Sequence, residues 1–380
     1  MKLSCTQENL SRGLGLVGRS VGTRATLPVL NNILLQTDKG RLKLSATDLE
    51  IGIHTWIGAK VDVDGGITIP ARLLMDYVNN NTDKTINLEL KESTLHLESE
   101  HFKANIKGIE ASEFPLIPEV SKNVSITVSS AEFSKAINRT VIATALDESR
   151  PVLAGVYFYN CKAISAERSS HNDVMKAVAT DSYRLAEQTI AINKGTSELK
   201  DFAFIVPQRT VSELGRIITD KAEKIQIYPG ENQVEFMIEE TILVSRLIEG
   251  TFPDYAQIIP KSTTTKAEIA TPEFNNAIKM ASLFARESAN NIKLKITSPD
   301  KLEVLATSAH IGDNVSQISA NVTGDNLEIA FNAKFIMDCL AVIDSDKVNL
   351  ELSNTLSPGL LKSPKDPNYL YVIMPLRVDE

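Results

Sequence analysis

The sequence predicts an α+β fold made of three tandem copies of one domain, and three repeated phrases support this prediction. A helical phrase occurs at 9–14, 132–137 and 273–278. An Ala-Thr phrase follows at 46–50, 179–183 and 306–310, and a phrase with a cation near its end follows at 69–73, 206–210 and 331–335. The phrases recur in the same order at intervals of roughly 120–140 residues, which is the size of a whole domain and too long for a solenoid unit.

The domain boundaries follow from two similar connectors. Glu113-Phe-Pro-Leu-Ile-Pro at 113–118 has a counterpart in Thr251-Phe-Pro-Asp-Tyr-Ala at 251–256. Proline restricts the backbone and favours an extended connector over a helix. We therefore expect domains at 1–120, 121–262 and 263–380.

Within each copy the sequence predicts short strands and two helices. The segments 33–36, 41–45, 86–90 and 94–98 alternate apolar and polar residues, as half-buried strands do. The segment 130–145 begins with a serine cap and has an apolar stripe of helical period, and 207–218 has a proline at its start and a similar stripe. Two helices laid on antiparallel sheet are expected in each domain.

Composition limits the classes of function. The chain has 380 residues, 43% of them hydrophobic, and its net charge is −8. The N-terminus lacks the apolar stretch of a signal peptide, and Cys5, Cys161 and Cys339 form no CxxC pair, so we expect a cytoplasmic protein. The five histidines show no metal-ligand spacing, and we expect neither a metal nor a cofactor. A negative total argues against nucleic-acid binding unless the positive charge is gathered on one face.

The cations do gather on the polar faces of the predicted helices. At 100° per residue, Lys135 and Arg139 lie opposite the apolar stripe of 130–145, and Arg209 and Arg216 lie opposite that of 207–218. Arg72, Arg209 and Lys334 hold equivalent positions in the three copies. Any amphipathic helix has a charged outer face, which is the alternative interpretation. Cations repeated without interleaved aromatic residues suit phosphate contacts that do not read sequence.

Two motifs suggest other chemistry. Gly13-Leu-Gly-Leu-Val-Gly18 satisfies GxGxxG, but a dinucleotide fingerprint must follow a strand, and here a polar helical segment precedes it. We interpret these glycines as a weakened end of a helix. Asp48 and Asp181 could be catalytic carboxylates, but an Asp at a strand end more often closes a turn through its own backbone, and the third copy has Ser308 there. We therefore expect no enzyme.

Longer motifs resemble a known family. They are Thr26-Leu-Pro-Val-Leu-Asn-Asn-Ile-Leu-Leu35, Ala46-Thr-Asp-Leu-Glu50, Ala179-Thr-Asp-Ser-Tyr-Arg-Leu185, Gly250-Thr-Phe-Pro-Asp-Tyr255 and Tyr371-Val-Ile-Met-Pro-Leu-Arg377. Together they resemble the bacterial DNA polymerase III β subunit family, the sliding clamps, over essentially the whole chain. The resemblance implies a head-to-tail homodimer, a closed ring around duplex DNA with helices lining the hole. It also implies that DNA polymerase III and the clamp loader bind through short linear peptides.

The resemblance also implies roles for particular residues. Arg24 and Arg72 match family residues that touch DNA, and Arg150 is expected to contribute there, because Pro151 and Val152 stand where the family often has aromatic rings. The partner-peptide pocket would be formed by Leu153, Thr180, Ser182, Tyr183, Arg184, Leu185, Pro253, Leu356, Val372, Met374, Pro375 and Leu376. The dimer contact would join Ala104 and Ile106 of the first domain to Leu283 and Phe284 of the third.

A three-domain adhesion or scaffold protein is the rival hypothesis. It would explain the repeat, but it gives no reason for cations at equivalent positions of the helices. Retention on circular duplex DNA, with loss from linear ends, distinguishes a ring from a scaffold.

Overall fold

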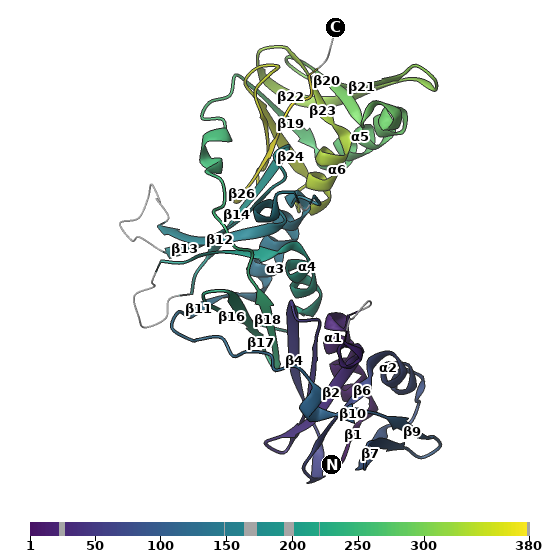
Figure 1. Cartoon of the computed structure of the whole chain (residues 1–380). Coiled ribbons are helices and arrows are strands. Elements are labelled where there is room, and N and C mark those ends of the chain that lie inside the picture. Colours follow the sequence, from purple (N-terminus) through teal and green to yellow (C-terminus); the bar gives the residue numbers. More distant parts are fainter. Residues whose placement is uncertain (23–26, 148, 163–172, 194–200, 220, 378–380) are drawn as a thin grey trace. The chain divides into compact units, whose positions relative to one another are not determined.

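The computed structural model describes the chain except for residues 23–26, 148, 163–172, 194–200, 220 and 378–380 (Figure 1). It divides into two compact units. Unit 1 contains 1–131 and 213–247 together with 193–200, and unit 2 contains 132–192, 201–212 and 248–380.

The structure repeats one pattern three times, as the phrases predict. The first helix of each copy follows a short strand. α1 (Gln7–Val17), α3 (Ser130–Thr140) and α5 (Thr271–Ala285) come after β1 (Lys2–Thr6), β11 (Ile126–Ser129) and β19 (Thr265–Ala270). The second helices, α2 (Ala71–Asn80), α4 (Gln208–Ile217) and α6 (Ala333–Val342), come after β6 (Gly66–Pro70), β15 (Ala203–Pro207) and β23 (Leu327–Asn332). The predicted α+β class and the threefold repeat are confirmed. The helix expected at 130–145 ends earlier, because a 3₁₀ turn at Val141–Ala143 follows α3.

Unit 1 holds two antiparallel sheets. The first has the order β5 (Lys60–Val63), β1 (Lys2–Thr6), β7 (Thr85–Lys91), β8 (Thr94–Glu98) and β9 (Lys103–Lys107). The second has the order β10 (Ile109–Glu110), β6 (Gly66–Pro70), β2 (Asn32–Asp38), β3 (Arg41–Thr47), β4 (Ile51–Gly58), β18 (Thr241–Arg246), β17 (Gln233–Ile238), β16 (Lys224–Pro229) and β11 (Ile126–Ser129).

Unit 2 is built on one long sheet. Its order is β15 (Ala203–Pro207), β12 (Gly155–Lys162), β13 (Asp173–Thr180), β14 (Arg184–Ala191), β26 (Asp366–Ile373), β25 (Gly359–Ser363), β24 (Lys347–Leu352), β19 (Thr265–Ala270), β22 (Gly312–Gly324), β21 (Lys301–Ser308), β20 (Asn291–Thr297) and β23 (Leu327–Asn332). The middle copy therefore gives four strands to the sheet of each neighbour, through the pairs β4–β18 and β14–β26. This continuity explains why three sequence repeats fold as two compact units.

The helices pack on the sheets through small residues where the approach is close. Thr6 caps α1 by accepting a hydrogen bond from the Asn9 amide at 3.3 Å. In the middle of α1, a Cβ on Gly13 would lie 2.7 Å from Leu44 of β3 and 2.9 Å from Ile57 of β4. The glycine lets α1 lie directly on the sheet. The interpretation of the glycine motif as the end of a helix is confirmed, because α1 runs through Gly13, ends at Val17 and has Gly18 as its C-cap.

The Ala-Thr phrases form the same turn in each copy. Asp48 accepts hydrogen bonds from the amides of Glu50 and Ile51 at 3.0 and 2.8 Å. Asp181 accepts from Tyr183 and Arg184, both at 2.9 Å. In the third copy the Ser308 hydroxyl accepts from the amides at 310 and 311. The prediction that these side chains close turns is confirmed.

Candidate functional site

The predicted phosphate contacts fall on several helices, and most of them are exposed. Arg72 lies in the first turn of α2, Arg209 in that of α4 and Lys334 in that of α6, and all three side chains are exposed. Equivalent sequence positions thus have equivalent structural positions. Arg24 lies outside the described residues. Their contact with DNA remains a prediction.

Arg216 is also exposed, but a carboxylate lies beside it. Its guanidinium forms an ion pair with Glu213 at 2.6 Å, within the last turns of α4. Arg19, after α1, approaches the same carboxylate at 3.9 Å. Glu213 is buried, so it reduces the positive potential that these two arginines present to solvent.

Arg139 is not a surface cation, and the prediction that it contacts DNA is wrong. Its side chain is buried, with 1% of its surface exposed. Its Nη1 donates to Asp366 at 2.6 Å and to Gln188 at 2.9 Å, and its Nε donates to the carbonyl of Val342 at 3.1 Å. The guanidinium also lies over the ring of Tyr369, 4.7 Å from its centroid. The polar face of α3 at this level packs against the third copy instead of facing solvent.

Lys135, one turn earlier on α3, is half exposed and forms a second ion pair with the same carboxylate, at 2.6 Å. Burial would raise the pKa of Asp366, but the hydrogen bonds from Lys135 and Arg139 outweigh it and hold that pKa below its usual range. Asp366 therefore holds two cations that the sequence places on one helical stripe. Only Lys135 can also reach a ligand in solvent.

A hollow of about 500 Å³ opens in unit 2 beside the turn after β13. Ser182 occupies the left-handed region in this turn, with φ at 77°, and Tyr183 next to it is 62% exposed. The wall of the hollow combines apolar and cationic side chains, among them Leu146, Leu153, Phe335, Arg150, Arg184 and Lys334. A cavity of this size with a few convergent polar groups is typical of a ligand site.

The two sides of the hollow are joined by Arg184. Its Nη1 donates to Asp338 of α6 at 2.5 Å, and its Nε donates to Asp181 at 3.0 Å. The guanidinium lies 4.3 Å from the ring centroid of Phe335. These contacts attach the turn of the second copy to the helix of the third. Arg150 reaches over the turn and donates to the hydroxyl of Ser182 at 2.8 Å.

The structure brings together part of the predicted pocket. Leu153, Ser182, Tyr183 and Arg184 line the hollow. Others lie beneath it or apart from it. Thr180 hydrogen-bonds the carbonyl of Arg184, and Leu185 and Val372 belong to the buried core under the turn. Pro253 and Leu356 are exposed, and Met374, Pro375 and Leu376 are half-buried, but none of these five lines this hollow.

The strand that carries the last of these residues ends as predicted. β26 stops at Ile373, and the amide of Met374 bonds the carbonyl of Tyr183 at 2.9 Å. The chain after β26 therefore runs beside the turn. The sequence reasoning missed Leu146 and Phe335. Phe335 could have been found, because it follows the repeated cation Lys334 directly, whereas the sequence around Leu146 gives no signal.

The residues predicted for the dimer contact differ in how exposed their side chains are. Leu283 on α5 is 43% exposed, and Phe284 is half-buried. Ala104 is half-buried and Ile106 buried, because both lie on the inner face of β9, opposite Leu97 and Leu95. That Ala104 and Ile106 belong to the dimer contact stays a prediction. β9 offers a backbone edge, since within the described residues it pairs only with β8.

The exposed cations, the hollow and the free strand edges belong to a chain that resembles known proteins. None of the helices in the described part of the chain is long and apolar enough to cross a membrane. Family models match three successive parts of the sequence. They describe the N-terminal domain of the DNA polymerase III beta subunit at residues 1–118, its central domain at 127–254 and its C-terminal domain at 256–377.

Individual proteins agree over the whole length. A beta sliding clamp from Staphylococcus epidermidis is 33% identical over 369 residues, covering 94% of both chains. The crystal structure of the DNA polymerase sliding clamp from Bacillus subtilis has a TM-score of 0.92 at 26% identity, and that of a putative DNA polymerase III beta subunit from Eubacterium rectale has 0.89 at 29%, each covering 100% of both chains. The resemblance seen in the motifs is confirmed, and the chain belongs to the DNA polymerase III beta subunit family, the beta sliding clamps.

Proposed function

We propose that the chain is a processivity factor of DNA replication. Two copies would form a closed ring that encircles duplex DNA, slides without sequence preference and tethers a polymerase. The ring would perform no chemistry. It would raise the effective concentration of the polymerase at the primer end, because loss into solution is replaced by sliding along the duplex.

The observation that carries this proposal is the repeated exposed cation. Arg72, Arg209 and Lys334 occupy the first turn of the second helix in all three copies of a chain from the clamp family. Exposed cations at helix starts suit loose phosphate contacts, which give affinity but do not read bases. Arg24, Lys135, Arg150 and Arg216 would add to this surface. Domain boundaries at 1–120, 121–262 and 263–380 are part of the proposal.

The dimer contact is supported by two free strand edges. In the described residues, Gly312–Ser319 of β22 pairs only with β21, and β9 has a free edge in unit 1. Val315 on the first edge is 57% exposed, and Leu283 is exposed on α5, which packs against β22. Unpaired edges of this kind readily add a strand. We propose that β9 of one copy pairs with this part of β22 in the other, twice, which closes a head-to-tail ring.

The hollow in unit 2 would bind the partner peptides. Leu153, Tyr183 and Phe335 offer an apolar wall, and Arg150 and Lys334 stand at its mouth. An apolar anchor gains about 25 cal/mol per Å² buried, offset by the ordering of the peptide, so we expect micromolar affinity. The cations favour peptides that carry an acidic residue next to the anchor. DNA polymerase III and the clamp loader would compete for this one site.

The experiment that tests the function compares circular and linear duplex. The chain is loaded onto nicked circular DNA with a clamp loader and separated by gel filtration. We expect it to co-elute with the circle and to be released when the circle is linearised by one cut. A chain that remains bound to the linear product, or that binds circle and line equally without a loader, would exclude a sliding ring.

A further inference from the structure

In unit 1 the first connector crosses the face of the nine-stranded sheet and leaves a cavity of about 570 Å³ beneath it. The connector is held by Phe114 and Val120, which are buried, and by Ile117, which fills the space above Gly52. Between these anchors the sheet contributes side chains from β2, β3, β4 and β18. The volume is in the range of small-molecule sites. These residues are not among the cations proposed to contact DNA, and they do not line the hollow proposed to bind partner peptides.

The second copy has the same site, and there its own side chains fill it. Judged by their strand registers, Leu34 and Gln36 of β2 occupy the same positions in the first copy as Tyr157 and Tyr159 of β12 occupy in the second. The equivalent connector places Tyr255 where the first has Ile117. Three phenolic rings of unit 2 thus stand where unit 1 has smaller or flexible side chains.

The rings of unit 2 pack closely. Tyr157 stacks on Tyr159 with centroids 5.1 Å apart and on Phe252 at 4.7 Å. The Tyr255 hydroxyl donates to Glu187 and lies 2.7 Å from that of Tyr159. Phe252 and Tyr255 belong to the buried core of this unit. The fold therefore accepts phenolic rings at this place and provides a hydrogen-bond acceptor for their hydroxyl.

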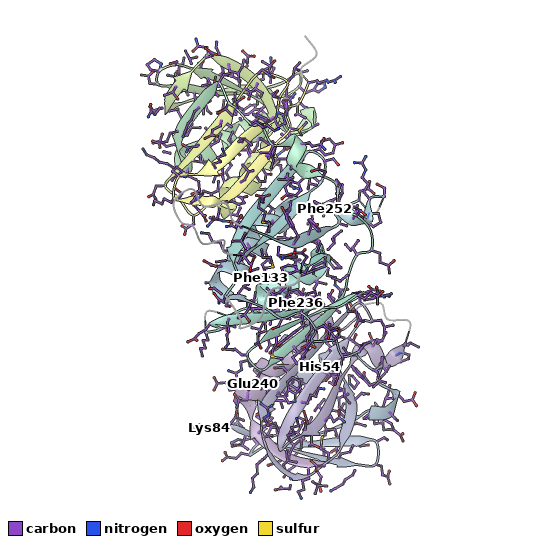
Figure 2. All side chains as sticks on the ribbon, turned by 90° about the vertical axis from the view of Figure 1, so that its left-hand side faces the viewer. His54, Lys84, Phe133, Phe236, Glu240 and Phe252 are labelled. Carbon is purple, nitrogen blue, oxygen red and sulfur yellow. The ribbon has the colours of Figure 1, made fainter. Side chains whose placement is uncertain are left out.

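In unit 1 His54 occupies the position of this acceptor. The register that pairs Ser45 with His54 corresponds to that of Val178 with Glu187. Figure 2 labels His54 among the strands of unit 1. The Nδ1 of His54 lies 2.7 Å from the Ser45 hydroxyl, and its Nε2 has no hydrogen-bond partner among the residues that the structure describes. Burial, with Lys43 nearby, lowers the pKa of His54 to about 4, so the imidazole is neutral at pH 7. When Nδ1 donates to Ser45, Nε2 is an acceptor.

We propose that the cavity beneath the first connector binds a phenolic ring, with Ile117 and Ile242 against the ring and the hydroxyl bonded to His54. The ring could be that of a free aromatic compound or of a tyrosine in a partner chain. In either case the ligand would place in the first copy a phenolic ring like those that the side chains of the second copy place there. This inference goes beyond the proposed function and does not depend on it.

The fluorescence of Trp56 can report ligand binding in the cavity. Trp56 is the single tryptophan, it lines the cavity, and its indole nitrogen donates to Asp38 at 2.7 Å. Trp56 fluorescence and calorimetry would be followed during titration with p-cresol, with toluene and with a capped Ala-Ala-Tyr-Ala-Ala peptide. We expect p-cresol to bind about five-fold more tightly than toluene, the factor that one net hydrogen bond gives. Binding of the peptide as well assigns the site to a partner tyrosine, and binding of p-cresol alone assigns it to a free compound.

Two variants and one control variant locate the binding. Gln36→Tyr places the ring of the second copy in the cavity and should abolish p-cresol binding, whereas Gln257→Tyr adds the same ring at an exposed position of unit 2 and should not. His54→Phe should remove the preference for p-cresol over toluene and keep toluene binding. Circular dichroism checks the folding of each variant, and His54→Phe alone still decides the matter if Gln36→Tyr is unfolded. Failure of both p-cresol and toluene to bind, or unchanged p-cresol binding in folded Gln36→Tyr, would overturn the proposal.

Discussion

Replacing Arg139 with alanine separates a structural cation from a DNA-binding one. In the sequence Arg139 belongs to the same polar stripe as Lys135, and both were predicted to contact phosphate. In the structure Arg139 is buried and donates to Asp366, Gln188 and the carbonyl of Val342. The variant leaves two buried acceptors without a donor and removes one of the two cations that neutralise Asp366.

The magnitude follows from these contacts. Breaking a buried ion pair by removing one partner costs about 3–5 kcal/mol, mostly because the remaining charge and acceptors stay desolvated. The contact with the ring of Tyr369 adds to this loss. Lys135 offers a matched control on the same helix. It pairs with the same carboxylate at 2.6 Å but is half exposed, so Lys135→Ala should cost only about 0.2–1 kcal/mol.

Amide hydrogen exchange is the suitable assay, because a chain of several domains need not unfold in one step. We expect Arg139→Ala to speed exchange in α3 and β26 about 100-fold or more, and Lys135→Ala by less than about 10-fold. Retention on circular DNA should fall in Lys135→Ala and Arg72→Ala. If Arg139→Ala left exchange unchanged and weakened DNA retention as much as Arg72→Ala does, the structural assignment of Arg139 would be refuted.

Three further outcomes are expected. Leu283→Asp should turn the dimer into monomer in sedimentation, since an unpaired charge in the contact costs several kcal/mol, while Asn276→Asp on the same helix should leave the dimer intact. Deletion of 374–380 should weaken binding of a polymerase peptide but not dimerisation, because the Met374 amide bonds the carbonyl of Tyr183 and the segment thereby supports the turn beside the hollow; equally tight peptide binding in a titration of the truncated chain would argue against this role. Asp366 has a lowered pKa in the folded chain, so its stabilisation is present above the ordinary pKa of about 4 and is lost as pH falls through the lowered value. The protection factors of the α3 amides, taken relative to the intrinsic exchange rate at each pH, should therefore fall in acid, and less so in Asp366→Asn.

The sequence predicted the local structure well, because helical period, strand alternation and turn chemistry act over a few residues. The strands expected at 41–45 and 94–98 appear as β3 and β8, and Asp48 and Asp181 close the turns expected of them. The family was also predictable, since long motifs occur in order over the whole chain. Contacts between residues far apart in the chain are different. Nothing in the local pattern around Arg139 shows that Asp366, 227 positions later, will cover it.

The same limit applies to the predicted dimer and pocket residues. Ile106 and Ala104 alternate along β9 with the exposed Lys103 and Lys107, so the sequence shows which face is apolar but not what covers it. Burial of Ile106 depends on the sheet partner, Leu95 of β8, which the strand itself does not specify. Leu185 and Val372 likewise lie in the core beneath the hollow and do not line it, because their strands pair with each other inside the sheet.

Differences between the copies point to the sites more directly than the repeated residues do. The Ala-Thr-Asp turn is kept in the first two copies because its hydrogen bonds fix the backbone, and the next two positions are free to vary. They are Leu49 and Glu50 in the first copy and Ser182 and Tyr183 in the second. The same turn therefore presents an aromatic ring and a bonded hydroxyl only in unit 2, where Phe335 faces it across the hollow. In a repeated fold such substitutions have little effect on stability, because each changes a surface side chain and leaves the backbone turn unchanged. The hollow of unit 2 and the cavity of unit 1 are then two results of the same freedom.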